Sequence, residues 1–566
     1  MLMASLACAQ LQYRVEIEAP EEMAATLRQG LSLARWQNDP QMTPEQLRRL
    51  ADESVREARE TAATEGYFSA QVSLSIQESP EQWVVRLAVD PGERTQVDDV
   101  DIEFRGPVTG DAEARELLAR VRERWSLRRG QPFRQQDWDA AKRGAVRELS
   151  GWRYAGASVA RSEALIDPGE RRARLRVELE SGPPFRFGEL RISGVRRYSE
   201  ELVENLSPFR AGDVYDRDQL LVYQRRLLES GYFVSVQADI DPAEGKVDSS
   251  PVRVAVIEAS TQHVEAGIGY NTDAGLRLEL RYSDQDLLDS AWRFRSGLRL
   301  DDKISSLQLD FDSPPRPGAR WNSFFGRARE TDIQNERTSE LAAGVSHNWG
   351  AEVAPSAVIL SAHVEEQRVA GQVTDDRHAV YGGFRRSFRM TDDFIAPRSG
   401  YLAVFELGGA PPGLASRAFL RGFISGSLFI PNGRRGDILL RGQAGRVLAE
   451  ARTGIPSSFL FRTGGDQTVR GYAFESLGVQ ERNAIVGGRR LIVMSAEYTH
   501  WFTDSWGLAG FVDGGDAGDD GSELEPAVGV GLGARFRTPI GPIRADVAYG
   551  ERTAQWRLHF SVGYTF

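Results

Sequence analysis

Cysteine is almost missing from this chain of 566 residues, which contains a single cysteine, Cys8. One thiol forms no intramolecular disulfide, and it supplies no thiolate metal site by itself. Motifs for zinc peptidases, P-loop nucleotide sites and Cys/His metal sites are also missing, and the six histidines are scattered along the sequence. We therefore expect no enzymatic activity, no cofactor and no metal.

Long hydrophobic runs are missing as well. No stretch of about eighteen apolar residues occurs, which excludes a helical membrane span. A membrane β-barrel stays open, because its strands alternate in polarity and leave only a weak hydropathy signal. The formal net charge of −11, without any block rich in lysine or arginine, argues against nucleic acid as a partner.

The first nine residues are typical of the end of a secretory signal peptide. Ala7-x-Ala9 matches a cleavage site, which would make Gln10 the new N-terminus. A charged n-region is missing and the apolar h-region is short, so we interpret this segment as a truncated signal peptide. Lipidation of Cys8 is the less favoured alternative, since a lipoprotein signal has leucine where this chain has Ser5.

From residue 11 to about residue 260 the chain repeats a pattern of one strand, two helices and two strands. The second helix of each repeat ends in a glycine-aromatic step, at Gly66-Tyr67, Gly151-Trp152 and Gly231-Tyr232. We expect these glycines to supply left-handed caps. The strands that follow are expected at residues 70–76 and 83–89, 157–159 and 173–179, and 234–240 and 252–257.

From residue 261 onward the sequence changes to short alternating runs, separated by glycine, aspartate, asparagine and proline. The number of runs is even, as single-chain bacterial outer-membrane barrels require. The sixteen expected strands are residues 264–271, 276–283, 292–300, 305–312, 321–329, 340–349, 357–369, 381–390, 402–407, 418–429, 437–448, 491–502, 507–513, 527–536, 543–548 and 556–566.

Side-chain chemistry along these runs favours a lipid-facing outer surface and a wet interior. The last run alternates apolar and polar residues and ends on Tyr564 and Phe566, and its aromatic residues are typical of interfacial girdles. Charge on the lipid face near the midplane costs about 2–4 kcal/mol. Five arginines must therefore face the lumen, namely Arg277, Arg281, Arg293, Arg295 and Arg299.

The long connection before the strand at 491–502 contains the motif Val469-Arg470-Gly471-Tyr472. Arg470 lies between bulky residues, so it either points to solvent or is drawn inside against an acid. Asp513 shares one face of its strand with Phe511 and is a natural bidentate partner for the guanidinium group. Glu497, on a neighbouring strand, is a second candidate for this network.

Three separated motifs resemble the outer-membrane BamA/TamA superfamily. They are the Val469-Arg470-Gly471-Tyr472 loop, the Phe511-x-Asp513-x-Gly515 strand and the Gly541-Pro542-Ile543-Arg544-x-Asp546 strand. The N-terminal repeats similarly resemble POTRA (polypeptide-transport-associated) domains. The resemblance implies a transmembrane antiparallel β-barrel of 16 strands preceded by three α+β POTRA domains, with the arginine-bearing loop inside the barrel. We expect the truncated signal peptide at 1–9, the POTRA domains at 10–95, 96–183 and 184–260, and the barrel at 261–566.

The resemblance also implies a location and a function. The barrel is expected in a Gram-negative outer membrane with the POTRA domains in the periplasm, where it would assemble autotransporters and other β-barrel proteins. Clients would enter through a lateral gate between the first and last strands. Glycines there leave little side-chain packing, and the expected gate residues are Gly267, Gly269, Tyr270, Phe560 and Gly563. Tyr564 and Phe566 would form the C-terminal assembly signal.

Within the family, the number of repeats and the chain length favour the TamA branch over the BamA branch. The implied partners are a TamB-like inner-membrane-anchored protein on the POTRA region, unfolded outer-membrane protein clients and outer-membrane lipid. Two alternatives stay open. One is a two-partner-secretion-type protein exporter, and the other is a passive pore or lipid conduit between the inner and outer membranes.

Overall fold

The structure is a computed structural model that describes residues 11–37, 39–80, 82–242, 246–351, 353–374, 376–393, 397–520, 524–538 and 541–562. The chain divides into two compact units. One comprises Met1–Glu189, Phe209–Leu220 and Asp239–Val252, and the other comprises Leu190–Pro208, Leu221–Ala238 and Arg253–Phe566. The expected signal peptide, and the expected gate and signal residues Gly563, Tyr564 and Phe566, lie outside the described residues.

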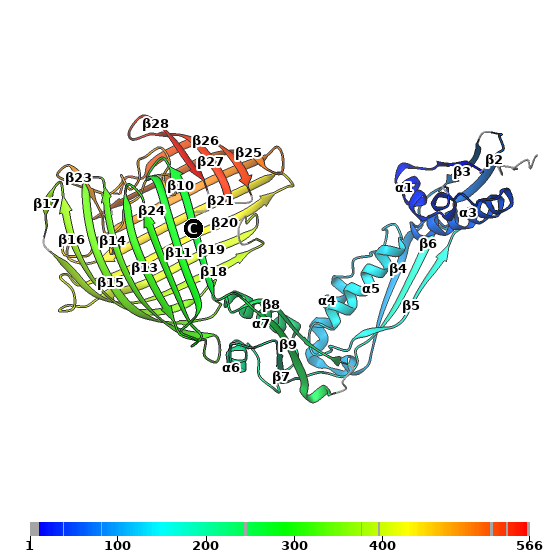
Figure 1. Cartoon of the computed structure of the whole chain (residues 1–566), viewed down its shortest axis with the longest axis horizontal. Coiled ribbons are helices and arrows are strands. Elements are labelled where there is room, and N and C mark those ends of the chain that lie inside the picture. The colour runs from blue at the N-terminus through cyan, green and yellow to red at the C-terminus, as the bar shows by residue number, and fades with distance from the viewer. Residues whose placement is uncertain are drawn as a thin grey trace, which may run out of the picture. The chain divides into compact units, whose positions relative to one another are not determined.

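The first repeat folds into a three-stranded sheet in the order β1-β3-β2, with its helices packed against it (Figure 1). Its elements are β1 (Tyr13–Glu18), α1 (Glu21–Gly30), α2 (Ser32–Arg35), α3 (Pro44–Thr64), β2 (Gln71–Gln77) and β3 (Trp83–Asp90). A capping box between Thr43 and Gln46 starts α3. Leu27 and Leu87 are fully buried in one apolar cluster and Leu47 in a second, so the helices pack on the sheet through two small clusters.

The second repeat has the same plan, in the order β4-β6-β5. Its elements are β4 (Gln96–Arg105), the 3-10 turns η1 (Pro107–Gly110) and η2 (Ala112–Ala114), α4 (Arg115–Glu123), α5 (Gln135–Leu149), β5 (Ser158–Asp167) and β6 (Arg172–Glu180). The inward residues of β6 alternate along the strand, and Leu175, Val177 and Leu179 pack with Trp138 and Leu149 of α5. This alternation places the two helices over one face of the sheet.

The third repeat forms the sheet β7-β9-β8. Its elements are β7 (Phe187–Ser193), α6 (Glu200–Asn205), α7 (Arg217–Glu229), β8 (Phe233–Ile240), η4 (Val247–Ser249) and β9 (Ser250–Glu258). Tyr223 and Leu227 are buried, whereas Leu228 is 42% exposed. Successive helical residues are rotated by about 100°, so Leu228 lies beyond the edge of the buried stripe.

The glycine-aromatic steps differ in their backbone conformation. Gly66 and Gly231 adopt positive φ values of 94° and 77°, which agrees with left-handed caps. The expectation is wrong for Gly151, because the left-handed residue of that turn is Arg153, at φ 63°. A β-carbon on Gly151 would lie 3.1 Å from Arg217 Nη2 and 3.2 Å from the Glu148 carbonyl oxygen. Close packing therefore accounts for glycine at this position.

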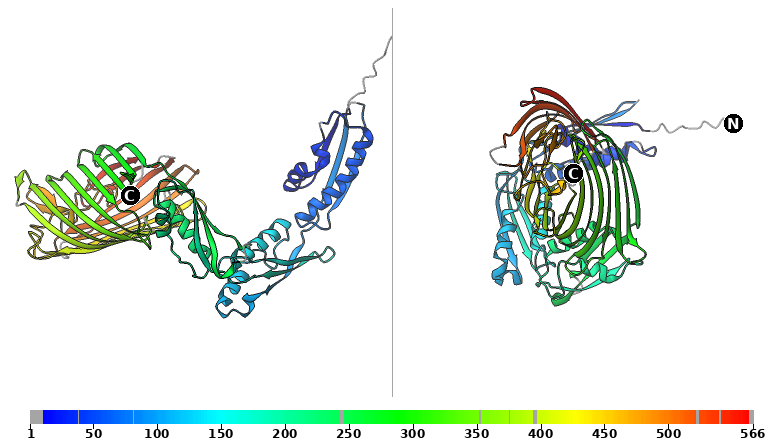
Figure 2. Two further views of the ribbon diagram at one scale, coloured as in Figure 1. Left: turned by 60° about the horizontal axis from the view of Figure 1, so that its bottom comes forward. Right: turned by 90° about the vertical axis from the view of Figure 1, so that its left-hand side faces the viewer.

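Antiparallel strands after the repeats close into a barrel of 16 long strands, with the two-residue β17 (Gln372–Val373) paired to β16 (Figure 2). Each expected strand is found, the last one as far as Val562. They are β10 (Gln262–Asn271), β11 (Gly275–Leu287), β12 (Trp292–Leu300), β13 (Ile304–Asp312), β14 (Arg320–Ile333), β15 (Glu336–Trp349), β16 (Ser356–Val369), β18 (Arg377–Thr391), β19 (Gly400–Ala410), β20 (Phe419–Asn432), β21 (Gly436–Leu448), β24 (Arg490–Trp501), β25 (Trp506–Gly518), β26 (Ala527–Thr538), β27 (Gly541–Gly550) and β28 (Gln555–Val562).

The wall of the barrel is apolar outside and charged inside. In β11, Leu276, Leu278 and Leu280 are exposed, whereas Arg277 and Glu279, which alternate with them, have side chains that are only 20% and 29% exposed. The arginines expected in the lumen pair with acids of neighbouring strands and turns. For example, Arg295 of β12 lies 2.6 Å from Asp312 of β13. No helix in the described part of the chain is long and apolar enough to cross a membrane.

Candidate functional site

The candidate site is an internal loop, residues 449–489, that connects β21 to β24 and enters the barrel. It contains the 3-10 turn η5 (Ser457–Phe459) and the short hairpin β22 (Val479–Glu481) and β23 (Ala484–Val486). Loop residues form a buried apolar cluster with residues of the wall. The cluster includes Phe459, Phe461, Val469, Tyr472 and Leu477 from the loop, and Tyr381, Phe419, Leu491 and Val493 from the strands. This apolar contact holds the loop inside an otherwise charged lumen.

Arg470 is buried, with 2% of its side chain exposed. Its Nε donates to Asp513 Oδ2 at 2.6 Å and its Nη2 donates to Asp513 Oδ1 at 2.9 Å, while its backbone N–H donates to the same carboxylate at 3.1 Å. Its Cζ also lies 3.3 Å from the centroid of the Phe511 ring. Arg470 is therefore held by a bidentate ion pair and a cation–π contact.

Two further acids and a second arginine complete this network. Arg470 Nη1 lies 2.6 Å from Glu497 Oε2 and 3.3 Å from Asp546 Oδ2. Arg535 bonds both of these acids, with its Nη2 donating to Glu497 Oε2 at 2.8 Å. Ser495 donates to Asp513 Oδ1 at 2.7 Å. The acids therefore come from β24, β25 and β27, and each faces at least one guanidinium group.

Arg535 is a site residue that the sequence analysis missed. It lies on β26, four residues after Gly531, on the strand face that also carries Gly529 and Gly533. An arginine on the lumen face of a strand was a readable signal, because it has the same alternation as Arg277 in β11. Nothing in the local sequence, however, indicates which acids it meets.

Glycines of the wall and of the motif make room for the loop backbone. A β-carbon on Gly529 would overlap the carbonyl oxygen of Arg470, and one on Gly515 would lie 3.0 Å from Val469 Cγ2. Gly471 adopts φ 93°, and a β-carbon there would lie 2.7 Å from the backbone nitrogen of Gly550. These glycines are therefore required by close approach of the loop to the wall.

Tyr472 ties the end of the motif to the wall. Its hydroxyl donates to the Val528 carbonyl oxygen at 3.0 Å and accepts from the Arg552 backbone N–H at 3.0 Å. Val469, at the start of the motif, is fully buried. All four motif residues thus contact the last strands or their turns.

A second set of contacts, absent from the sequence analysis, holds the other end of the loop. Arg462 Nη1 lies 2.6 Å from Glu336 Oε2 of β15. The Ser457 backbone N–H donates to the Glu365 carboxylate of β16 at 2.9 Å, and Arg377 of β18 donates to the Ile455 carbonyl oxygen at 3.0 Å. The sequence signal that could have indicated these contacts is the presence of acids at lumen-facing positions of the strands. The loop therefore contacts two separate parts of the wall.

The expected gate lies where β10 meets β28. Among the described residues these strands pair at Asn271 with Ser561, and the expected gate residue Gly563 lies outside the described residues. A β-carbon on Gly269 would meet nothing within 4 Å, and Tyr270 is 52% exposed on the outer face. Gly267 and Phe560 also lie on these two strands. The seam is thus the junction at which the first and last strands of the barrel meet.

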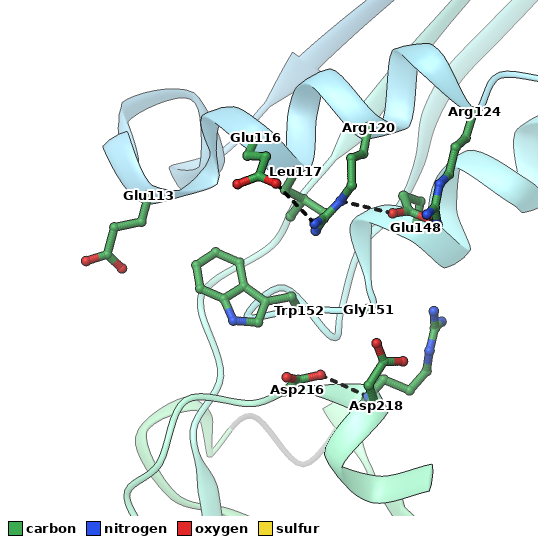
Figure 3. Close-up of a pocket in the computed structure, with 11 residues that line it drawn as sticks. Glu113, Glu116, Leu117, Arg120, Arg124, Glu148, Gly151, Trp152, Asp216 and Asp218 are labelled. Atoms are coloured by element: carbon green, nitrogen blue, oxygen red, sulfur yellow. Dashed lines mark hydrogen bonds and ion pairs between the residues drawn. The ribbon is translucent and has the colours of Figure 1, made fainter. Parts of the chain in front are cut away.

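A separate pocket of about 430 Å³ lies in the N-terminal unit, beside α4, α5 and the first residues of α7 (Figure 3). Trp152 lines it, together with Arg120 of α4 and Glu148 of α5, whose charged groups lie 3.4 Å apart. Glu148 also accepts from Arg124 at 2.9 Å. No group of three or more histidines, cysteines or acids in the described residues is arranged to hold a metal ion.

Three family models match the chain. Residues 260–566 match the Omp85 superfamily domain, residues 14–91 match the model described as POTRA domain TamA domain 1, and residues 185–259 match the surface antigen variable number repeat. The solved structure of BamA from Haemophilus ducreyi lacking POTRA domains 1–3 aligns with a TM-score of 0.59 at 14% identity. The alignment covers 83% of this chain and 100% of that one. The two proteins therefore share a fold.

Two curated relatives are similar in sequence. The outer membrane protein assembly factor BamA of Nitratidesulfovibrio vulgaris is 23% identical over 412 residues, which are 66% of this chain and 50% of the relative. The chloroplastic outer envelope protein 80 of Arabidopsis thaliana is 32% identical over 153 residues, which are 21% of this chain and 19% of the relative. The chain thus spans half the length of the first relative and less of the second.

The Omp85 match covers more than half of the chain and coincides with the barrel and its internal loop. The N-terminal matches cover the first and third of the small sheets. The barrel therefore lies in the outer membrane and the POTRA domains lie in the periplasm. On these grounds the chain belongs to the Omp85 superfamily.

Proposed function

We propose that this protein inserts and translocates outer-membrane proteins, assembling autotransporters and other β-barrel proteins through a lateral gate between β10 and β28. The observation that carries the proposal is that the barrel closes between its first and last strands, at the described pair of Asn271 and Ser561. In hydrocarbon an unpaired strand edge is costly, because its N–H and C=O groups find no water. A client strand that pairs with such an edge removes this cost by β-augmentation.

The relatives support an assembly role of this kind. The similar protein from Nitratidesulfovibrio vulgaris bears the name of an outer membrane protein assembly factor. The match of residues 14–91 to the first POTRA domain of TamA supports the TamA branch of the family. The proposed partners are then a TamB-like inner-membrane-anchored protein on the POTRA region, and unfolded outer-membrane clients with the surrounding lipid.

The internal loop has a part in this proposal. A gate that opens between β10 and β28 leaves the other strands to hold the barrel together. The Arg470 network bonds the loop to β24, β25 and β27, and the Arg462 contacts bond it to β15. We infer that the loop braces the lumen while the seam moves.

The test is a disulfide across the seam. Asn271→Cys and Ser561→Cys place two thiols at the one described paired position, on a background in which Cys8 is replaced by serine. The matched control is Ala328→Cys with Leu341→Cys, which pair between β14 and β15 in the continuous wall. Client assembly is measured with each protein oxidised and reduced.

We expect the oxidised seam pair to abolish assembly, reduction to restore it, and the β14–β15 pair to have no effect in either state. Full assembly by a completely oxidised seam pair would exclude the lateral gate. Export of an unfolded client through the locked barrel would favour the two-partner-secretion type of exporter. A steady conductance that does not depend on the lock would favour a passive pore.

A further inference from the structure

The internal loop bonds both sides of the seam. On one side, Asp273 lies in the turn between β10 and β11, and its Oδ2 accepts from the backbone N–H of Asp466 at 2.8 Å. On the other side, Nε2 of His559 in β28 accepts from the backbone N–H of Gly471 at 3.0 Å. Loop residues 466–471 therefore connect the first hairpin of the barrel to its last strand.

Both wall residues are buried, with 6% of the Asp273 side chain and 2% of the His559 side chain exposed. A buried acceptor without a hydrogen bond is destabilising. Each loop N–H therefore donates a hydrogen bond to an acceptor that water does not reach. His559 Nδ1 also lies 3.7 Å from Asp273 Oδ1. The two sides of the seam thus meet at this point, beside the loop backbone.

Backbone shape supports the same contact. Gly465 adopts φ 105°, and a β-carbon on it would lie 2.7 Å from Asp273 Oδ2. A glycine at this position lets the loop approach the carboxylate closely enough for the Asp466 N–H to bond it. The loop is thus shaped to fit the turn at the start of the barrel.

Direct contacts between the two strands lie next to these loop bonds. The described strands share the Asn271–Ser561 pair, and the Phe560 backbone N–H donates to Thr272 Oγ1 at 3.4 Å. The Arg470 network adds nothing here, because its acids lie on β24, β25 and β27. The bonds from Asp466 and Gly471 are therefore a separate connection, which reaches the turn after β10 and strand β28.

We propose that residues 466–471 form a clasp that holds the seam closed, with Asp273 and His559 as its two positioning residues. Opening the seam then requires the loop to release at least one of them. Because Arg470 lies inside the clasp and is bonded to the wall, movement of the loop and separation of the strands are linked. This inference rests on the proposed lateral gate, and it names the contacts that set its closed state.

The test is amide hydrogen exchange of the purified full chain in detergent, without any client. His559→Leu and Asp273→Ala each remove one acceptor, and we expect exchange in β10 and β28 to rise about tenfold, the typical worth of one hydrogen bond. Exchange in β14 and β15, in the continuous wall, should stay unchanged. Heat-modifiable migration on gels verifies that each variant is a folded barrel.

Matched controls separate the clasp from general damage. His559→Gln and Asp273→Asn keep an acceptor oxygen, so their seam exchange should stay close to that of the unmodified protein. Asp466→Ala removes a side chain but keeps the bonding N–H, and it should also leave the seam closed. If His559→Leu fails to fold, seam exchange in Asp273→Ala tests the clasp, because this substitution changes a turn outside the strands.

Unchanged seam exchange in a folded Asp273→Ala or His559→Leu variant would overturn the clasp, whatever those variants do in an assembly assay. Faster seam exchange with unchanged client assembly would separate the two proposals. That result would support the clasp and would exclude the lateral gate as the route by which clients enter. Faster exchange together with altered assembly supports both.

Discussion

Gly529 of β26 leaves open the space next to the carbonyl oxygen of Arg470, and a β-carbon at Gly529 would overlap that oxygen. The position of the motif is therefore set by backbone contact as well as by charge. The next lumen-facing glycines of β26 act similarly, because a β-carbon on Gly531 would meet the Phe511 ring and one on Gly533 would overlap Asp546. The strand is shaped to receive both the loop and the acids that hold it.

Gly529→Ala is expected to displace the Arg470 motif from the wall, because backbone on both sides of the contact leaves no flexible side chain to move away. We expect a lower unfolding temperature, easier proteolysis of residues 449–489 and loss of client assembly. Gly514→Ala is the control, since a β-carbon on Gly514 meets nothing within 4 Å. Equal behaviour of the two variants would show that the contact does not position the loop.

Arg470→Ala should be more severe than the loss of one surface ion pair. It leaves Asp513 buried without its guanidinium partner, and breaking a buried pair in this way costs about 3–5 kcal/mol. Arg470→Lys restores the charge but not the planar fork, so we expect intermediate stability and intermediate assembly. Thermal unfolding and client assembly measure both effects.

The control for Arg470 is Arg482→Ala, in the same loop, where the side chain is exposed. We expect its stability to change by less than about 0.5 kcal/mol, the usual range for surface substitutions. If Arg470→Ala were equally mild, the ion-pair network would have no measurable part in holding the loop.

Much of the barrel was predictable from the sequence, because alternation of polar and apolar residues is a local signal. Arg470 and Asp513 were also readable as candidate partners, because Asp513 shares one face of its strand with Phe511, although the arginine alone left a solvent-facing position open. The contacts of Arg462 with Glu336, and of Gly471 with His559, join segments far apart in the sequence. Their partners depend on the path of the loop, and no local periodicity encodes that path.

Gly151 shows a different limit of local patterns. The glycine-aromatic step is the same in all three repeats, yet the backbone is left-handed at Gly66 and Gly231 and not at Gly151. There the glycine is accounted for by the Arg217 side chain packed against it. A repeated dipeptide therefore predicts the end of a helix better than it predicts the reason for the glycine.

Arg462 and Glu336 should act as one unit in holding the far end of the loop. Their ion pair at 2.6 Å is buried, with side chains that are 10% and 1% exposed. In a double-mutant cycle with Arg462→Met and Glu336→Gln, we expect a coupling energy of about 0.5–3 kcal/mol in thermal unfolding. The exposed pair of Arg337 and Glu330 supplies the control cycle, with an expected coupling below about 1 kcal/mol. Equal couplings would show that the Arg462 pair does not anchor the loop.

Tyr13 should make the first POTRA domain sensitive to alkaline pH. Its hydroxyl is buried and donates to the Leu33 carbonyl oxygen at 2.8 Å. Burial, with a smaller contribution from the negative charge of Asp39, raises the pKa of Tyr13 to about 12. An unfolded tyrosine titrates near about pH 10, so the folded domain holds this proton more tightly than the unfolded chain does. The contribution of this proton to the stability of the folded domain is therefore complete below about pH 10, and it is lost as the pH rises toward 12.

We expect the fraction of the first POTRA domain that survives pulse proteolysis to fall between pH 10 and pH 12, the window set by the raised pKa of Tyr13. The free energy of unfolding at risk is about 3 kcal/mol, following the size of the pKa shift. Tyr13→Phe removes the titrating hydroxyl, so it should start less stable by about 1 kcal/mol and lose less over that window. A spectrophotometric titration of both proteins checks the assignment directly. If both titration curves and both survival curves coincided in shape, the alkaline transition would have to come from another group.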